Sequence, residues 1–142
     1  MEQKNYNKKI LIISSNFYPE ITRNLLDGVT QVLDNEKKNY ESKFVRGSLE
    51  LPFFLEKYKN NFEGFIILGC IIKGETDHYD IVKNISMGQI YKIAYKNNLA
   101  LSSALLTVEN YSQALERSEV SKKNLGGLAA KTCLELIQKL NE

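Results

Sequence analysis

One apolar run constrains the fold of this chain more than any other segment. Residues 65–72 read Phe-Ile-Ile-Leu-Gly-Cys-Ile-Ile, a continuous apolar stretch with the length of a buried strand. The run stops at 73–76 (Lys-Gly-Glu-Thr), and a long helical pattern follows over 76–97. The segment therefore predicts a strand–turn–helix unit, which is typical of α/β proteins.

The same alternation of strand and helix patterns continues along the chain. Segments 10–13, 40–45 and 99–106 predict three further strands. Helical patterns occupy 21–33, 52–58, 76–97, 111–117 and 130–140, and 120–124 is a polar loop. Such alternation forms a parallel sheet with right-handed crossovers and helices on both faces. We therefore expect one α/β domain over 1–142, after a polar and flexible segment at 1–9: a flavodoxin-like three-layer αβα sandwich whose four-stranded parallel sheet is flanked by helices.

Composition narrows the classes of function. The chain has 142 residues, 43% hydrophobic and 25% charged, and its net charge of +2 indicates no nucleic-acid partner. It has no apolar stretch of 18 residues and no apolar core of a signal peptide, so we expect no membrane partner and a cytoplasmic protein. Cys70 and Cys133 are then free thiols. One histidine and two distant cysteines do not form a usual zinc site, so we expect no metal.

The helix predicted over 76–97 begins beside a potential anion site. A glycine-containing turn that opens a helix presents free backbone N–H groups at the positive end of the helix dipole. His78, the single histidine, is expected one turn inside this helix, where imidazole suits proton transfer beside a bound phosphate. A capping or surface role for His78 is the alternative. The apolar side of the helix is predicted at Ile81, Val82, Ile85, Ile90, Ile93 and Ala94.

Four motifs lie where the predicted strands end, which is the edge at which parallel sheets bind ligands. They read Asn16-Phe17 with Ile21-Thr22 and Leu25-Leu26; Gly47-x-x-Glu50-x-Pro52; Leu68-Gly69-x-x-Ile72-Lys73-Gly74-Glu75-Thr76-x-His78-Tyr79-Asp80; and Leu106-Thr107-x-Glu109-Asn110-x-x-Gln113-Ala114-x-Glu116-Arg117. In this order and spacing they resemble the lumazine synthase (6,7-dimethyl-8-ribityllumazine synthase) family over almost the whole chain.

The resemblance implies a transferase reaction in riboflavin biosynthesis. The family condenses 5-amino-6-(D-ribitylamino)uracil with 3,4-dihydroxy-2-butanone 4-phosphate to 6,7-dimethyl-8-ribityllumazine, the penultimate step of the pathway, without a metal or redox cofactor. It also implies homopentamers or multiples of them, with active sites between subunits and with riboflavin synthase as a candidate partner. Single pentamers, decamers and shells of 60 subunits remain open from one sequence.

The family's site residues carry over to matching positions. Phe17 is expected to stack on the pyrimidine, although a core anchor at the helix start is the alternative. Glu50 is expected to hold the ribityl chain, and it could also face the helix dipole. His78 matches the family's acid/base, and Arg117 its phosphate clamp rather than a surface arginine. The remaining expected ligands are Ser48, Leu49, Cys70, Ile71, Ile72 and Ser103 for the pyrimidine and ribityl groups, and Glu75 and Thr76 for the phosphate.

Several positions depart from the family pattern. Arg46 stands where many relatives have proline, Leu49 where many have phenylalanine, and Ser103 where an aromatic often lines the ribityl pocket. Leu125 replaces the usual lysine beside the phosphate, and Lys123 is a candidate substitute after a loop shift. The competing hypotheses are a flavin- or lumazine-binding paralogue with weak catalysis, a relative of archaeal-type riboflavin synthase, and an unrelated flavodoxin-like phosphate-binding domain.

Overall fold

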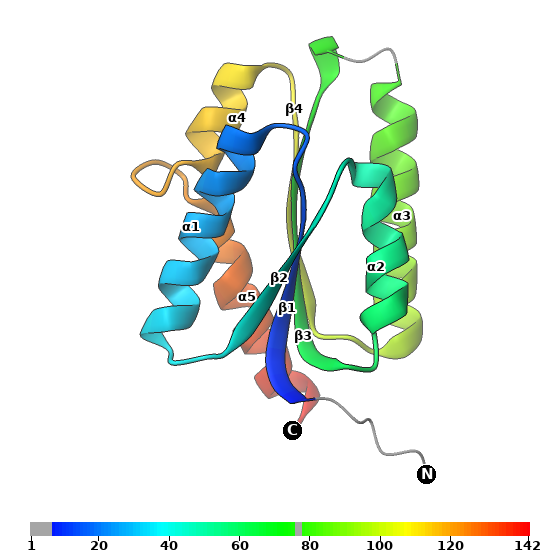
Figure 1. Ribbon diagram of the computed structural model, residues 1–142, viewed down its shortest axis with the longest axis vertical. Helices are drawn as coiled ribbons and strands as arrows, with labels where there is room; N and C mark the ends of the chain where they lie inside the picture. The colour runs from blue at the N-terminus through cyan, green and yellow to red at the C-terminus, as the bar shows by residue number, and fades with distance from the viewer. Residues whose placement is uncertain (1–6, 76–77) are drawn as a thin grey trace.

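The computed structural model describes residues 7–75 and 78–142, and in these ranges strands and helices alternate (Figure 1). The strands are β1 (Asn7–Ser15), β2 (Tyr40–Val45), β3 (Phe62–Ile72) and β4 (Leu101–Val108). The helices are α1 (Pro19–Asn35), α2 (Leu51–Tyr58), α3 (Tyr79–Asn97), α4 (Tyr111–Ser118) and α5 (Leu125–Leu140), with short 3-10 turns at Ser48–Glu50 and Lys73–Glu75.

The four strands form one parallel sheet in the order β2-β1-β3-β4. Helices α1, α4 and α5 cover one face and α2 and α3 the other, so the molecule has three layers (Figure 1). The predicted α/β sandwich with a four-stranded parallel sheet is therefore confirmed. All four strands point the same way, which brings their carboxyl ends to one edge of the sheet.

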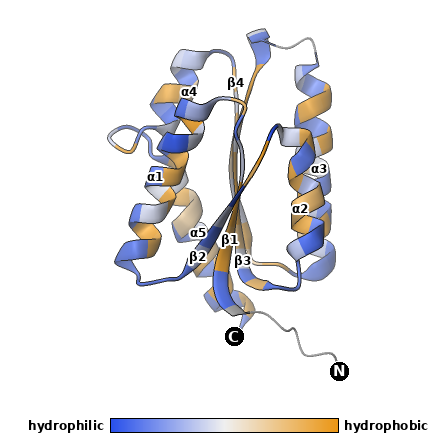
Figure 2. Cartoon of the chain, in the orientation of Figure 1, coloured by the Kyte–Doolittle hydropathy of each residue, from blue (hydrophilic) through white to orange (hydrophobic). Residues whose placement is uncertain are grey.

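Alternating side chains of the central strands build two cores. Ile10, Ile12 and Ile66 pack under α1 and α5, whereas Leu11 and Ile13 pack under α2 and α3. The central strands are mainly hydrophobic, and the helices carry hydrophobic and hydrophilic residues side by side (Figure 2). Burial of both faces explains why β3 is a continuous apolar run rather than an alternating one.

Gly126 permits the closest approach between two helices on the α1 face. A Cβ at this position would lie 2.1 Å from the carbonyl oxygen of Leu25 in α1. The start of α5 therefore packs directly on the α1 backbone. Asn124, which precedes α5 with a left-handed φ of 47°, caps it by accepting a hydrogen bond from the Gly127 N–H.

Some predicted boundaries move. β1 begins at Asn7, within the polar N-terminal segment, and β4 begins at Leu101 instead of 99. The shift in β4 arises because Asn98 ends α3 in a left-handed conformation, with φ of 56°, and the Leu99 N–H bonds to the Ala94 carbonyl. These bonds hold the chain in the helix cap before it can join the sheet.

The predicted apolar side of α3 was partly wrong. Ile90 and Ala94 are buried against the sheet as expected, but Ile81 and Ile85 are 55% and 51% exposed. Ser86 lies on the buried face instead, where its hydroxyl bonds to the Val82 carbonyl. Helix α3 therefore has a second apolar strip, which the described part of the chain leaves exposed. Among the described residues, no helix is long and apolar enough to span a membrane.

Candidate active site

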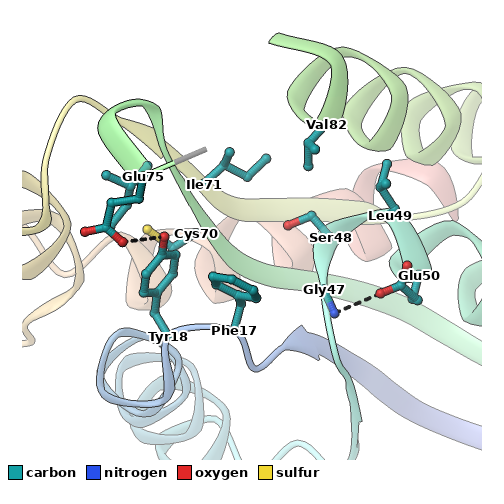
Figure 3. A pocket seen from close by; sticks show the side chains of 11 residues that line it. Phe17, Tyr18, Gly47, Ser48, Leu49, Glu50, Cys70, Ile71, Glu75 and Val82 are labelled. Atoms are coloured by element: carbon teal, nitrogen blue, oxygen red, sulfur yellow. Dashed lines mark hydrogen bonds between the residues drawn. The ribbon is translucent and has the colours of Figure 1, made fainter. Parts of the chain in front are cut away.

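A cavity of about 260 Å³ opens where β1, β2 and β3 end (Figure 3). Its walls come from the loop after β1, the turn after β2, the end of β3 with the turn that follows it, and the first part of α3. Its lining residues are Phe17, Tyr18, Gly47, Ser48, Leu49, Glu50, Cys70, Ile71, Ile72, Glu75 and Val82. The structure thus brings together most of the predicted pyrimidine and ribityl ligands.

Phe17 forms the wall contributed by the loop after β1. Its side chain is 66% exposed, so it is no core anchor of α1. The ring meets Tyr18 edge to face, with centroids 5.0 Å apart and an interplanar angle of 73°. This edge contact leaves a ring face available to a planar ligand, since aromatic groups also favour offset stacking.

The turn after β2 forms the opposite wall. The Glu50 carboxylate accepts a 3.0 Å hydrogen bond from the Gly47 N–H, and the Glu50 N–H donates to the Gly47 carbonyl at 3.2 Å. These reciprocal bonds fix the 3-10 turn that carries Ser48 and Leu49. Ser48 is buried and Leu49 partly exposed. A carboxylate and a hydroxyl on one rigid turn can hydrogen-bond several hydroxyls of a polyol.

The end of β3 contributes a mostly apolar floor. Cys70, Ile71 and Ile72 are all buried. Burial, followed by the charge of Glu75, raises the pKa of the Cys70 thiol to about 12. The thiol is therefore neutral near pH 7 and is a poor nucleophile, because the thiolate is the reactive form. The end of β3 therefore offers a planar ligand an apolar surface. Its neutral thiol does not attack that ligand.

Tyr18 is a pocket residue that the motifs missed. Its hydroxyl donates a 2.8 Å hydrogen bond to Oε2 of Glu75 (Figure 3). Burial first, and then the hydrogen bond to Glu75, raise the pKa of Tyr18 above its ordinary value. Its position next to Phe17, at the same strand end, is the only sequence signal that pointed to it. Gly47 and Val82 also line the cavity without having been predicted.

Comparison with known proteins shows the family to which this sequence belongs. A family model described as 6,7-dimethyl-8-ribityllumazine synthase matches residues 7–141. The chain belongs to the 6,7-dimethyl-8-ribityllumazine synthase family. It is 36% identical to the lumazine synthase of Bartonella tribocorum and 39% identical to that of Bartonella bacilliformis, each over 96% of this chain and 93% of the relative. The Paramagnetospirillum magneticum lumazine synthase is 38% identical over 91% of this chain and 92% of the relative. The predicted resemblance is confirmed.

His78, the residue that resembles the lumazine synthase acid/base, lies at the start of α3. It was predicted one turn inside the helix, which is wrong: α3 begins at Tyr79, and His78 is its N-cap. The reason is the separate 3-10 turn at Lys73–Glu75, which takes up the chain between β3 and the helix. His78 is exposed and is not among the described residues that line the cavity. Thr76, an expected phosphate ligand, lies outside the described residues.

Two other expected ligands lie elsewhere on the chain. Ser103 is on β4, where its hydroxyl accepts a 3.1 Å hydrogen bond from the Leu105 N–H. Arg117 is on α4, which packs on the face opposite to α2 and α3. Within 7–75 and 78–142, Nη1 of Arg117 is buried without a hydrogen-bond partner. Neither residue lines the cavity.

The position of the missing lysine belongs to α5. Leu125 is the first residue of that helix and packs against the core. Lys123 lies in the preceding turn, where its N–H bonds to the Glu116 carbonyl and its side chain is exposed. Its substitution for the family lysine stays a prediction. Among the described residues, no group of three or more histidine, cysteine, aspartate or glutamate side chains could hold a metal ion.

Proposed function

We propose that this protein condenses 5-amino-6-(D-ribitylamino)uracil with 3,4-dihydroxy-2-butanone 4-phosphate to 6,7-dimethyl-8-ribityllumazine. Membership of the lumazine synthase family supports this reaction. The observation that carries it is the cavity, in which an exposed aromatic ring, a fixed carboxylate and an apolar floor meet. The activity would supply the penultimate step of riboflavin biosynthesis.

The pyrimidine half of the site is assigned to the cavity. Phe17 stacks on the ring, and the backbone of Cys70–Ile72 frames its polar edge. Ser48 and Glu50 bind hydroxyls of the ribityl chain, while Leu49 contacts its carbon atoms. The existing Gly47–Glu50 hydrogen bonds support this assignment, because the carboxylate is already oriented before a ligand arrives.

The phosphate half is assigned to the segment after β3. Backbone N–H groups of Glu75 and Thr76, and the Thr76 hydroxyl, bind the phosphate at the start of α3. Arg117 supplies the charged, bidentate contact. In one chain Arg117 does not line the cavity, so we assign this contact to Arg117 of a neighbouring copy.

Proximity and proton transfer drive the proposed chemistry. The amine of the pyrimidine attacks the ketone carbon, and loss of water gives the Schiff base. Elimination of phosphate, rearrangement and a second attack with loss of water then close the ring. His78 moves protons among the amine, carbonyl and hydroxyl groups. The substrates react with each other once held together, so orientation supplies much of the acceleration.

We further infer a homo-oligomer built on a pentamer ring, in which sites form between subunits. Its support is that neither Ser103 nor Arg117 lines the cavity of one chain, and that α2 and α3 expose apolar side chains, notably Phe53, Ile81 and Ile85. Large exposed apolar surfaces mark contacts between proteins. We also propose a cytoplasmic protein, consistent with its two unbridged cysteines, and riboflavin synthase as a partner.

The decisive experiment mixes both substrates with the purified protein and follows lumazine fluorescence. We expect product only when both substrates are present. Binding of lumazine or flavin without turnover would replace this proposal with a binding paralogue, which the loss of lysine at Leu125 favours. Turnover of lumazine alone, with release of the pyrimidine and without the butanone phosphate, would indicate a riboflavin synthase instead.

A further inference from the structure

Tyr18 joins two parts of the site that lie far apart in sequence. It is the N-cap residue of α1, and Glu75, its hydrogen-bond acceptor, is 57 residues away at the end of the Lys73–Glu75 turn. The 2.8 Å bond runs along one side of the cavity (Figure 3). It connects the loop that carries Phe17 with the turn to which we assign the phosphate.

The Tyr18 ring is held independently of Glu75. It contacts the rings of both Phe17 and Tyr111, and its centroid lies 6.3 Å from that of Tyr111 at an angle of 62°. The Tyr18 carbonyl also accepts from the Thr22 N–H at 3.0 Å, and the Tyr111 hydroxyl donates a separate 2.9 Å bond to Glu20 that does not involve Tyr18. The Tyr18 hydroxyl is therefore a fixed point from which Glu75 can be oriented.

The charge state of the pair favours a lasting contact. A phenol keeps its proton over the neutral range at its ordinary pKa, and burial and Glu75 raise the pKa of Tyr18 further. A neutral phenol that donates to a carboxylate forms a stronger bond than two neutral groups do. The turn has three residues, so fixing its last side chain restricts the N–H groups of the turn as well.

We propose that Tyr18 is a positioning residue that sets the distance between the phosphate-binding turn and the pyrimidine-stacking Phe17. The inference rests on the proposed function and adds to it a contact of this chain. Small displacements between bound reactants cause large losses of rate, so a fixed separation favours attack of the amine on the ketone. Tyr18 would act through Glu75, without contact with the reacting atoms.

The test compares Tyr18→Phe with the matched variant Tyr111→Phe. Each substitution keeps the ring and deletes one hydroxyl that donates to a carboxylate. For Tyr18→Phe we expect the KM for the butanone phosphate and the Kd for inorganic phosphate to rise about three- to tenfold, and the KM for the pyrimidine to change by less than about twofold. Tyr111→Phe should change none of the three values.

A double-mutant cycle gives the same proposal a second test. In a Glu75→Ala background, Tyr18→Phe should have no further effect on phosphate binding, because its partner is already absent. Unchanged phosphate binding in Tyr18→Phe, or equal losses for both substrates, would overturn the positioning role. A wild-type protein that makes no lumazine would refute the proposed function instead, and the phosphate titration would still decide the role of Tyr18.

Discussion

The cavity at the ends of β1–β3 and the region formed by β4 and α4 differ in whether their charged side chains have hydrogen-bond partners. In the cavity, Glu50 and Glu75 each accept a hydrogen bond within the chain, so both carboxylates are oriented. In α4, Nη1 of Arg117 is buried and, within the described part of the chain, has no partner. One region is preorganised, while the other has a charged donor that is not yet satisfied.

The difference matters because Nη1 of Arg117, unpaired within the described residues, is buried. A buried polar group without a partner costs free energy, so a ligand or another chain that pairs with Nη1 of Arg117 would recover that cost. We propose that the cavity of one chain holds most of the pyrimidine and ribityl contacts, whereas the phosphate half takes Arg117 from a neighbouring copy. Predictions that separate the two halves test the contrast directly.

The largest effect is expected at His78, the N-cap residue of α3. His78→Ala should lower the single-turnover rate about a hundredfold, near the bottom of the range for acid/base catalysis, since proximity supplies the rest. The limb of the pH–rate profile assigned to imidazole should flatten. Pyrimidine binding and the thermal unfolding midpoint should stay unchanged, because the side chain is exposed. A wild-type rate with an unchanged pH profile would return His78 to a capping role.

Arg117→Ala tests the half of the site that one chain does not complete. A hydrogen bond to a charged group is worth about 1.5–3 kcal/mol, so binding of the butanone phosphate should weaken about ten- to a hundredfold. Binding of the pyrimidine should not change, since Arg117 does not line the cavity. Isothermal titration with each substrate measures both values. Equal losses would indicate a structural role for Arg117 in α4.

Mixed oligomers show whether Arg117 acts on a neighbouring copy. Glu50→Ala removes a ribityl contact from the cavity, and Arg117→Ala removes the phosphate contact from α4. Each pure variant should therefore have low activity. After coassembly, about a quarter of the sites would combine an intact cavity with an intact Arg117 from a neighbour. Recovery of activity would support shared sites. A stable, active monomer in light scattering would contradict the assembly.

Phe17→Ala should have a smaller effect, confined to the preorganised half. We expect pyrimidine binding to weaken about tenfold through lost stacking and lost apolar contact. Phosphate binding and protein stability should change little, because the ring is exposed rather than part of the core. Tyr95→Ala removes another exposed aromatic, outside the cavity, and serves as the control. A large loss of stability in Phe17→Ala would restore the core-anchor interpretation.

The cavity walls were predictable because they depend on local patterns. Apolar runs fixed the positions of β1 and β3, and parallel strands place their carboxyl ends together. Phe17, Glu50 and Ile71 therefore converge as the motifs implied. What the sequence did not reveal depends on contacts between distant segments. The Tyr18–Glu75 bond joins residues 57 positions apart, and no spacing rule relates them.

Surfaces that another chain could cover were harder to predict for a different reason. Periodicity identifies apolar side chains on a helix but does not say what buries them. Ile81 and Ile90 both belong to the apolar pattern of α3, yet one is exposed and the other buried. Similarly, the motif around Arg117 predicts phosphate binding, but it does not indicate whether Arg117 binds the substrate phosphate in its own subunit or in a neighbouring one.

The smallest expected effect concerns a buried cysteine thiol, which is present in both regions. Cys70 lines the cavity, and Cys133 in α5 donates to the Ala100 carbonyl just before β4, at 3.6 Å. Burial is the main cause that raises the pKa of each thiol to about 12.

In the unfolded chain these thiols ionise near pH 9. The stabilisation that each buried, protonated thiol gives to the folded protein is therefore present below that pH and is lost as pH rises toward 12. The free energy of unfolding should therefore fall by about 1 kcal/mol per thiol between pH 8 and 10. Denaturant unfolding of Cys70→Ala, Cys133→Ala and the double variant separates the two contributions. The slope that remains in the double variant measures the other groups with shifted pKa values, which are Lys38 and the tyrosines. Because Cys70 borders an open cavity and Cys133 is fully buried, Cys133→Ala should remove at least as much of the slope. If Cys70→Ala removed more of the slope than Cys133→Ala, the cavity wall would exclude water better than the core between β4 and α5.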